Sequence, residues 1–361
     1  MTSSTNDSSS KIFPRASIEM VRRRYLIIRF SSFGDIMQAL PAATLIREKD
    51  PTAEIHWLTR SDFAPVVKSL EAIDQVWALR RQDGWRGLFR LIGELRRERF
   101  THLYDAHSNL RSGLIIFALK LNAWVTGQFS TEWAHRSKDR LKRILLFRFR
   151  INLFEKPFRG AHSYLAPLKK WFGSAALLQN VSLNLDSEIL QLPVGFDLEN
   201  TIALAPGAAW GLKLWPTENW QKLVRANPQF SYVLLGGPDD KMCEEIVAAA
   251  TSPAVNLAGR LSWLQSLQLI ELSRGLVAGD TGLLHAADLM QKPAVAIIGP
   301  TAFGYPSHDS TLVAEIDLPC RPCTKDGRGR CHNSVMKRCL VELSADRVSV
   351  LMNQLRPNSE F

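Results

Sequence analysis

The feature that most constrains how this 361-residue chain folds is a series of apolar strand, short polar loop and helix that occurs twice. The first series has an apolar run at Arg24–Phe30, a predicted helix over Ile36–Lys49 and a second apolar run at Glu54–Leu58. The second series starts at Thr201–Gly207 and alternates helices with strands as far as Ala294–Ile298. This alternation is typical of parallel sheets built from right-handed βαβ units. We therefore expect an α/β protein with two similar domains, whose ligands bind at the carboxyl ends of the strands.

The length also predicts two domains, since a domain usually has about 100 to 200 residues. A polar stretch over 193–200 separates the two series, so we place the N-terminal domain at 23–192 and the C-terminal domain at 193–361. Residues 1–22 are rich in serine and lack the apolar core of a signal peptide, which predicts a disordered tail. No apolar run approaches the roughly 18 to 20 residues of a spanning helix. We expect a cytoplasmic protein.

The net charge of +10 indicates an acidic partner, and the surplus is concentrated in two segments. Trp133–Arg150 has seven Lys or Arg residues against Asp139, interleaved with apolar residues, and Trp85–Phe100 has a similar mixture. Such segments suit anionic lipid headgroups or a phosphorylated glycolipid, and the alternative is an ordinary solvated helix face. Nucleic acid is the other acidic candidate, but the chain has no helix-turn-helix, RNP or zinc-finger signature.

The run Asp280–Ala287 combines an anion-binding turn with an imidazole, where a predicted buried strand gives way to a predicted helix. The amides of Thr281 and Gly282 then lie at the helix start, where unpaired N–H groups attract phosphate or carboxylate. His285 lies one turn further, on the side that can face the ligand of the turn. The structural alternative is that Asp280 or Thr281 only caps the helix and that His285 packs inside the domain.

Neither series has the Gly-x-Gly-x-x-Gly fingerprint or a Walker loop, which argues against a dehydrogenase and a P-loop kinase. Each has instead a polar loop at the carboxyl end of its first strand. In the first series Asp35 stands at a helix start, where capping is the alternative to a chemical role. In the second, Gly207 and Gly211 let the backbone approach a ligand, and Lys213 supplies a mobile positive charge nearby. Together with the turn at Asp280, Lys213 would give two phosphate-binding elements on one rim.

Four of the five cysteines form the pattern Cys320-x2-Cys323-x7-Cys331-x7-Cys339. In a cytosolic chain, closely spaced thiols raise the question of zinc before that of disulfides. The first pair has zinc-ligand spacing, but the later intervals fit no standard zinc knuckle or ribbon. We therefore expect no metal here, and a surface loop over 321–330 with reduced thiols packed beneath it.

Several short motifs occur in order: Phe33-Gly34-Asp35-Ile36 with Leu40-Pro41, Pro206-Gly207 with Lys213-x-Trp215-Pro216, Leu257-Ala258-Gly259, and Asp280-Thr281-Gly282-x-x-His285. With this set the chain, from about Tyr25 to its end, resembles the bacterial lipopolysaccharide heptosyltransferases of glycosyltransferase family 9. The resemblance implies a GT-B fold, in which two Rossmann-like domains face each other across a central cleft. It also implies inverting, metal-independent transfer of heptose from ADP-heptose to the lipopolysaccharide inner core, without a cofactor.

The resemblance assigns roles to individual residues. Asp35 matches the proposed general base of the family, in the N-terminal acceptor-binding domain. In the C-terminal nucleotide-sugar-binding domain the residues that match the donor site are Lys213, at the donor diphosphate, and Asp280, Thr281, Gly282 and His285. The implied partners are the nucleotide-sugar donor, a lipopolysaccharide core or lipid A-type acceptor, and the anionic cytoplasmic face of the inner membrane, where the protein would be peripheral. The cysteine cluster is similar to one in many family members, which also favours the interpretation without zinc.

Two points stay open after the resemblance. Ala208 and Ala209 stand where some family members have hydroxyl or acidic residues, so phosphate contacts by Gly207 and Ala208 would come from the backbone. The alternatives are a family 9 enzyme with another nucleotide sugar or acceptor, and a non-catalytic glycolipid-binding protein of the same fold. Asp35 at a helix start is expected to stay ionised and to be a weak base, so its orientation matters more than its basicity.

Overall fold

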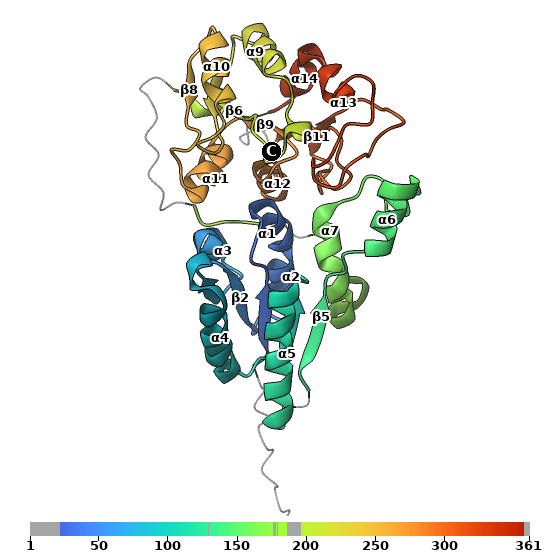
Figure 1. The fold of residues 1–361 in the computed structure, drawn as a ribbon. Helices are drawn as coiled ribbons and strands as arrows, with labels where there is room; N and C mark the ends of the chain where they lie inside the picture. Colours follow the sequence, from blue (N-terminus) through green and yellow to red (C-terminus); the bar gives the residue numbers. More distant parts are fainter. Residues whose placement is uncertain (1–21, 129, 176–177, 179, 186–195, 357–361) are drawn as a thin grey trace, which may run out of the picture.

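Two separate parallel sheets form the centres of two domains, which lie one above the other in Figure 1. The computed structural model describes residues 22–356 except 129, 176–177, 179 and 186–195. The strands are β1 (Arg24–Ile28), β2 (Glu54–Arg60), β3 (Gln75–Leu79), β4 (His102–Asp105), β5 (Glu132–His135), β6 (Thr201–Ala205), β7 (Ser231–Leu234), β8 (Ala254–Asn256), β9 (Gly275–Gly279), β10 (Ala294–Ile297) and β11 (Thr311–Ala314). Their orders are β3-β2-β1-β4-β5 and β11-β10-β9-β6-β7-β8. Counted from β6, the second order is that of the Rossmann fold, so the predicted α/β class with two Rossmann-like domains is confirmed.

Helices connect the parallel strands in both domains. They are α1 (Phe33–Ala39), α2 (Pro41–Lys49), α3 (Ala64–Lys68), α4 (Gly84–Leu95), α5 (Leu110–Val125), α6 (Arg140–Phe149), α7 (Gly160–Leu165), α8 (Lys169–Phe172), α9 (Thr217–Ala226), α10 (Met242–Ala249), α11 (Trp263–Leu272), α12 (Gly282–Leu289), α13 (Arg338–Val341) and α14 (Ala345–Met352). Strand β1 shows why the sequence forms this architecture. Tyr25 and Ile27 pack into one buried cluster, and Leu26 and Ile28 pack into another. A strand that is buried on both faces is typical of a parallel sheet covered by helices on both sides.

The helix predicted over Ile36–Lys49 is two helices. Because the ring of Pro41 removes a backbone N–H, α1 ends at Ala39 and α2 begins at the proline itself, where proline is favourable. Helix α1 also begins earlier than predicted, at Phe33, so Asp35 lies inside its first turn. The predicted tail, apart from Arg22, and the predicted boundary after residue 192 lie outside the described residues.

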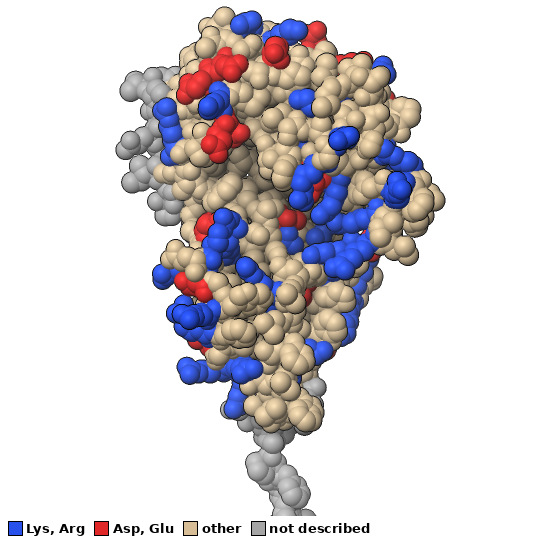
Figure 2. All heavy atoms as spheres, viewed as in Figure 1, with Lys and Arg blue, Asp and Glu red and all other residues tan. Residues whose placement is uncertain are grey.

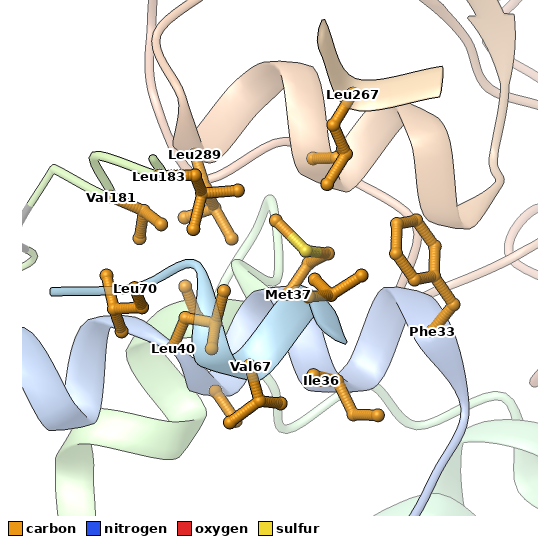
Figure 3. Packing of buried hydrophobic residues seen from close by; sticks show 14 of the residues in the cluster. Phe33, Ile36, Met37, Leu40, Val67, Leu70, Val181, Leu183, Leu267 and Leu289 are labelled. Carbon is orange, nitrogen blue, oxygen red and sulfur yellow. The ribbon is translucent and has the colours of Figure 1, made fainter. Parts of the chain in front are cut away.

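The two domains share one hydrophobic cluster, which Figure 3 shows from close by. Phe33, Met37 and Leu40 of the N-terminal domain point towards Leu267 on α11 and Leu289 on α12. All five side chains are buried, and each buried side chain of this size contributes about 1.5 to 3 kcal/mol. This packing holds the start of α1 next to α12. None of the helices in the described part of the chain combines the length and apolar character needed to span a bilayer.

Candidate active site

Asp35 is held by three side chains near the end of β1. Arg29, just beyond the strand, places a guanidinium nitrogen 2.6 Å from the Asp35 Oδ2 atom. Ser32 donates its hydroxyl proton to the same oxygen at 2.8 Å, and the Tyr164 hydroxyl donates to Oδ1 at 2.9 Å. The backbone N–H of Ser32 also donates to Oδ2 at 3.3 Å, so the carboxylate does cap its helix, as the structural alternative predicts. Asp35 is therefore a capping residue whose carboxylate is also fixed in direction.

The charges around Asp35 keep its carboxyl group ionised. Burial alone raises the pKa, but Arg29, Ser32, Arg136 and Tyr164 outweigh it, and the pKa lies well below its ordinary value. The side chain is still 38% exposed, so a hydroxyl group from solution can reach it. Asp35 can accept a proton at any physiological pH, and its low pKa makes it a weak base, as expected from its position.

The predicted donor residues Lys213, Asp280 and His285 meet in the C-terminal domain. The Lys213 Nζ atom lies 3.0 Å from the Asp280 carboxylate, and His285 Nε2 lies 3.6 Å from it. Thr301 donates its hydroxyl proton to the same carboxylate at 2.6 Å. Burial raises the pKa of Asp280, but Lys213, His285 and Thr301 lower it more, so the group stays ionised. Asp280 therefore positions Lys213 and His285 instead of capping α12.

The start of α12 has no side-chain cap. Thr281 is the N-cap residue by its backbone angles, but its side chain accepts no capping hydrogen bond. The hydroxyl of Thr281 is buried and has no hydrogen-bond partner among the described residues. A buried hydroxyl without a partner costs about 1 to 3 kcal/mol, and uncapped N–H groups at a helix start favour an anion. These observations favour the anion-binding interpretation of the turn over the capping interpretation.

Two glycines bring Asp35 and the donor motif together. A methyl group on Gly34 would lie 3.0 Å from the Gly282 Cα atom and 3.1 Å from a ring carbon of His285. A methyl group on Gly282 would lie 2.5 Å from the ring of Phe33. Only residues without a Cβ let the starts of α1 and α12 approach so closely. Asp35 thus directly follows Gly34, the residue that contacts the motif at 280–285.

The remaining predicted donor residues, Gly207 and Ala208, lie on a neighbouring loop. A methyl group on Gly207 would lie 2.3 Å from the carboxylate of Asp240. That carboxylate accepts a hydrogen bond from the backbone N–H of Gly237 at 2.7 Å. Gly207 and Ala208 are partly exposed, so their backbone is accessible to a ligand. Gly207 thus packs against the turn that contains Gly237 and Asp240.

A group of cations lies near Asp35, where α6 and α7 approach the C-terminal domain. Figure 2 shows Lys and Arg side chains gathered where α6 and α7 face the C-terminal domain. Arg136 stacks 3.8 Å above the centre of the Tyr164 ring. Burial lowers the pKa of Lys138, and the nearby charges of Arg29, Arg140 and, from the C-terminal domain, Lys325 lower it further. Cations held this close to one another favour an anionic ligand between them.

Sequence reasoning missed the residues that hold Asp35 and Asp280 in place. Arg29 could have been recognised from the sequence, because it is a charged residue at the end of a buried apolar run. Tyr164, Arg136 and Thr301 could not, since each lies far along the chain from the carboxylate it serves. Their roles depend on the tertiary structure.

Among the described residues, one group of three or more possible metal ligands has its donor atoms within 4.8 Å of one another: Glu54, His56 and Glu98. Arg24 pairs with both glutamates, at 3.0 and 3.5 Å, and Trp77 donates to the other ring nitrogen of His56 at 3.0 Å. The polar groups of these side chains are therefore already paired with one another. They lie near the amino end of the sheet, away from Asp35.

The two Rossmann-like domains place an ionised carboxylate of one beside an uncapped helix start and a lysine of the other. This arrangement suits group transfer from an anionic donor. The model of glycosyltransferase family 9 (heptosyltransferase) matches residues 88–330, more than half of the chain. The chain therefore belongs to glycosyltransferase family 9 and is a glycosyltransferase. The matched segment contains Lys213 and the 280–285 motif and begins after Asp35.

Individual proteins give the same family. Lipopolysaccharide heptosyltransferase 1 of Pseudomonas aeruginosa is 25% identical over 334 residues, which cover 84% of this chain and 86% of that protein. The crystal structure of a family 9 glycosyl transferase from Veillonella parvula superposes with a TM-score of 0.72 at 16% identity, over 92% of this chain and 97% of that one. The Escherichia coli heptosyltransferase WaaC with ADP has a TM-score of 0.66 at 17% identity, over 92% and 99%. These two structures share the GT-B fold expected from the sequence.

Proposed function

We propose that this protein transfers heptose from ADP-heptose to the inner core of lipopolysaccharide, with inversion at the anomeric carbon and Asp35 as the general base. The proposal is supported by the family, by the relative named as a lipopolysaccharide heptosyltransferase, and by the related structure that contains ADP. The observation that carries it is the position of the ionised, partly exposed Asp35 beside the 280–285 motif.

The transfer is a single displacement. The oxygen of an acceptor hydroxyl attacks the anomeric carbon of the heptose, and the bond from that carbon to the ADP oxygen breaks on the opposite face. Asp35 accepts the hydroxyl proton, and ADP leaves with the bonding electron pair. Since Tyr164 and Arg29 fix the two carboxylate oxygens, orientation supplies much of the effect of a weak base.

The leaving diphosphate gains negative charge during this step, and the C-terminal domain has the groups to stabilise it. Lys213 supplies a positive charge, and the amides at the start of α12 supply N–H donors. The unpaired hydroxyl of Thr281 adds a third donor. These groups carry out the charge stabilisation that a divalent cation performs in many nucleotide enzymes, which supports a reaction without a metal.

The acceptor would be bound through its acidic groups. Arg136 lies near Asp35, and Lys138 lies near Lys325; these cations suit the phosphate or carboxylate groups of a lipopolysaccharide core. Because Lys325 belongs to the C-terminal domain, the acceptor would contact both domains.

A lipid-linked acceptor implies contact with an anionic membrane surface, and the N-terminal domain has a suitable face. On α5, Leu110, Phe117 and Trp124 are 78%, 65% and 67% exposed, at spacings that place them on one side of the helix. The adjacent α4 buries most of its apolar residues but exposes Trp85 and Phe89 beside its arginines. The predicted basic segment Trp85–Phe100 is thus half core and half surface.

The other predicted basic segment agrees better with a surface role. On α6, Leu146 is the only residue classed as buried, while Leu141 and Phe149 are exposed among the basic residues. Exposed aromatic and leucine side chains beside Lys and Arg are typical of helices that lie in a bilayer interface. Serine at Phe117 and Trp124 should reduce co-sedimentation with vesicles rich in phosphatidylglycerol, and serine at the exposed Val350 is the matched control. Unchanged sedimentation would remove the membrane face from the proposal.

The base is tested with Asp35→Asn, which keeps the size of the side chain but removes its charge. We expect transfer to fall by at least about 100-fold, because a general base contributes about 10² to 10⁴. ADP should still raise the melting temperature, since the donor residues are intact. The control is Asp346→Asn, an exposed aspartate in the first turn of α14, which should transfer normally.

Three outcomes would contradict the proposal in different ways. Normal turnover of Asp35→Asn would remove the base assignment and leave the family intact. A preference of the wild type for UDP or GDP over ADP in the thermal assay would change the donor. Binding of ADP without any transfer or hydrolysis of the donor would favour a non-catalytic glycolipid-binding protein.

A further inference from the structure

We propose that Cys320, Cys323, Cys331 and Cys339 together bind one thiophilic transition-metal ion, Zn²⁺ or Fe²⁺, and that this ion holds the loop that covers Lys213. All four sulfurs carry free thiols in the structure, as the sequence predicted. The inference departs from the sequence-based expectation of no metal. It rests on where the fold brings the four residues.

The four cysteines line one small cavity, although they are spread over twenty residues of chain. Leu212 and Pro300, the sequence neighbours of Lys213 and Thr301, also line it. The volume of the cavity is about 10 Å³, which is about the space that one water-sized body occupies. The fifth cysteine, Cys243, is buried in α10 and is not part of this group. A cavity for a single small body, lined by four thiols, is the environment that a tetrahedral metal site requires.

The groups next to the sulfurs suit thiolates. The backbone N–H of Lys337 donates to the Cys331 sulfur at 3.3 Å, and the Asn333 side-chain amide donates to the Cys320 sulfur at 3.8 Å. Lys337 and Arg338 both line the cavity. Arg338 forms an ion pair with Glu342 at 2.8 Å, so Lys337, whose Nζ atom donates to the Leu214 carbonyl at 3.2 Å, is the cation that partly offsets the two negative charges of a divalent ion with four thiolates. Donors that point at ligand sulfurs are the usual outer contacts of such sites.

Without an ion the thiols are expected to stay protonated. Burial raises the pKa of Cys323, and the neighbouring sulfurs of Cys320 and Cys331 raise it further. Burial also raises the pKa of Cys339, to about 11. Metal binding would release these protons, so its affinity must rise with pH.

In the structure, the cysteine sulfurs lie too far apart to bind one metal ion together. The described residues whose donor atoms already lie within 4.8 Å of one another are those around His56, and the cysteines are not among them. Rotation of the side chains about χ1 must therefore bring the sulfurs together. The first three cysteines lie outside regular helices and strands, which leaves them free to adjust to the short Cys339 helix, α13.

The consequence for the active site follows from the loop between Cys323 and Cys331. The backbone N–H of Cys323 donates to the Pro300 carbonyl at 3.0 Å, next to Thr301 of the donor site. Gly327, with φ near 89°, packs so closely on Lys213 that a methyl group there would lie 2.6 Å from the lysine Cγ atom. An ion at the cysteines would thus fix both ends of the segment that lies on Lys213.

The first experiment measures the metal content of the purified full-length protein by inductively coupled plasma mass spectrometry. We expect about one zinc or iron per chain. Serine at any one of the four cysteines should lower the content at least tenfold, while Cys243→Ser, the matched control, should keep it. Wild-type protein without metal, with four titratable free thiols or with disulfides found by peptide mass spectrometry, would overturn the proposal.

A second measurement does not depend on the folding of the variants. Wild-type protein stripped with a chelator is titrated with Co²⁺ alone. A stoichiometric increase in thiolate-to-cobalt charge-transfer absorption, reversed by Zn²⁺, is expected. Absorption without a stoichiometric end point, or none, would contradict the site.

The effect on the donor site rests on the proposed function and is measured separately. Removal of the metal should weaken ADP binding several-fold, because the cover of Lys213 is released. Metal bound at the cysteines without any change in ADP affinity would keep the metal site and remove its link to Lys213. ADP binding that fails in the metal-loaded protein would count against the proposed donor instead.

Discussion

Replacement of Lys213 by methionine would test whether the charges of the donor site are balanced as the structure indicates. Lys213 and Asp280 are 15% and 10% exposed and lie 3.0 Å apart. Loss of one partner from a buried pair costs about 3 to 5 kcal/mol, because a charge is left without compensation. His285 and Thr301 still contact Asp280 in this variant, so we expect the lower end, about 3 kcal/mol.

Protonation of Asp280 sets an upper limit on this cost. An aspartate that is neutral when folded and has a pKa of about 3.9 when unfolded loses about 4 kcal/mol of stability at pH 7, at about 1.4 kcal/mol per pH unit. In the wild type the pKa of Asp280 is lowered, so its contribution is present above pH 4 and is lost only as the pH falls through the folded pKa. In Lys213→Met the pKa is raised, and the sign reverses: the variant should gain stability as the pH falls from 7 towards 5.

Urea denaturation between pH 5 and 8 measures this difference. In that pH range, Asp280 should make no pH-dependent contribution to the free energy of unfolding of the wild type. Lys213→Met should become less stable as the pH rises. The double variant with Asp280→Asn should recover much of the stability at pH 7 without recovering the thermal shift by ADP. Lys222→Met, at an exposed lysine of α9, is the control. A loss of stability below about 1 kcal/mol in Lys213→Met, with no dependence on pH, would refute the stabilising role of the buried pair.

The remaining predictions concern Arg29 beside Asp35 and the close contact between the two domains at Gly282. Because Arg29 helps to lower the pKa of Asp35, the wild-type kcat/KM should show no acidic limb above about pH 4, and Arg29→Met should introduce one; identical pH profiles would contradict the role of Arg29. A methyl group on Gly282 would lie 2.5 Å from the Phe33 ring, so Gly282→Ala should destabilise the fold by about 1 to 3 kcal/mol and slow transfer. Gly93→Ala, in open space on α4, should be harmless or stabilising in the same melts, and equal effects of the two would contradict the close approach.

The fold could be predicted because its signals are local. Apolar runs such as Thr201–Gly207 and their intervening helices identify a parallel α/β architecture without any knowledge of distant contacts. The helix break at Pro41 is also a local property, although the helix expected over Ile36–Lys49 runs through it. The closely spaced motif at 280–285 could be proposed as a candidate site for the same reason.

The parts of the site that could not be predicted depend on tertiary contacts. Asp35 is fixed by Tyr164, and Asp280 by Thr301, through pairs that no spacing in the sequence reveals. The cysteine spacing argued against a metal because it matches no standard finger, but the fold brings all four residues to one cavity. Spacing rules describe sites built on one short loop, and this cluster includes a residue of helix α13.

The central claim is that this protein transfers heptose from ADP-heptose with inversion. It is tested most directly by nuclear magnetic resonance of the product formed from ADP-heptose and a lipopolysaccharide core acceptor, read at the anomeric centre of the transferred sugar. We expect a new heptosyl linkage whose anomeric configuration is opposite to that of the donor, and no such linkage with Asp35→Asn. A product with retained configuration, or transfer from another nucleotide sugar but not from ADP-heptose, would contradict it.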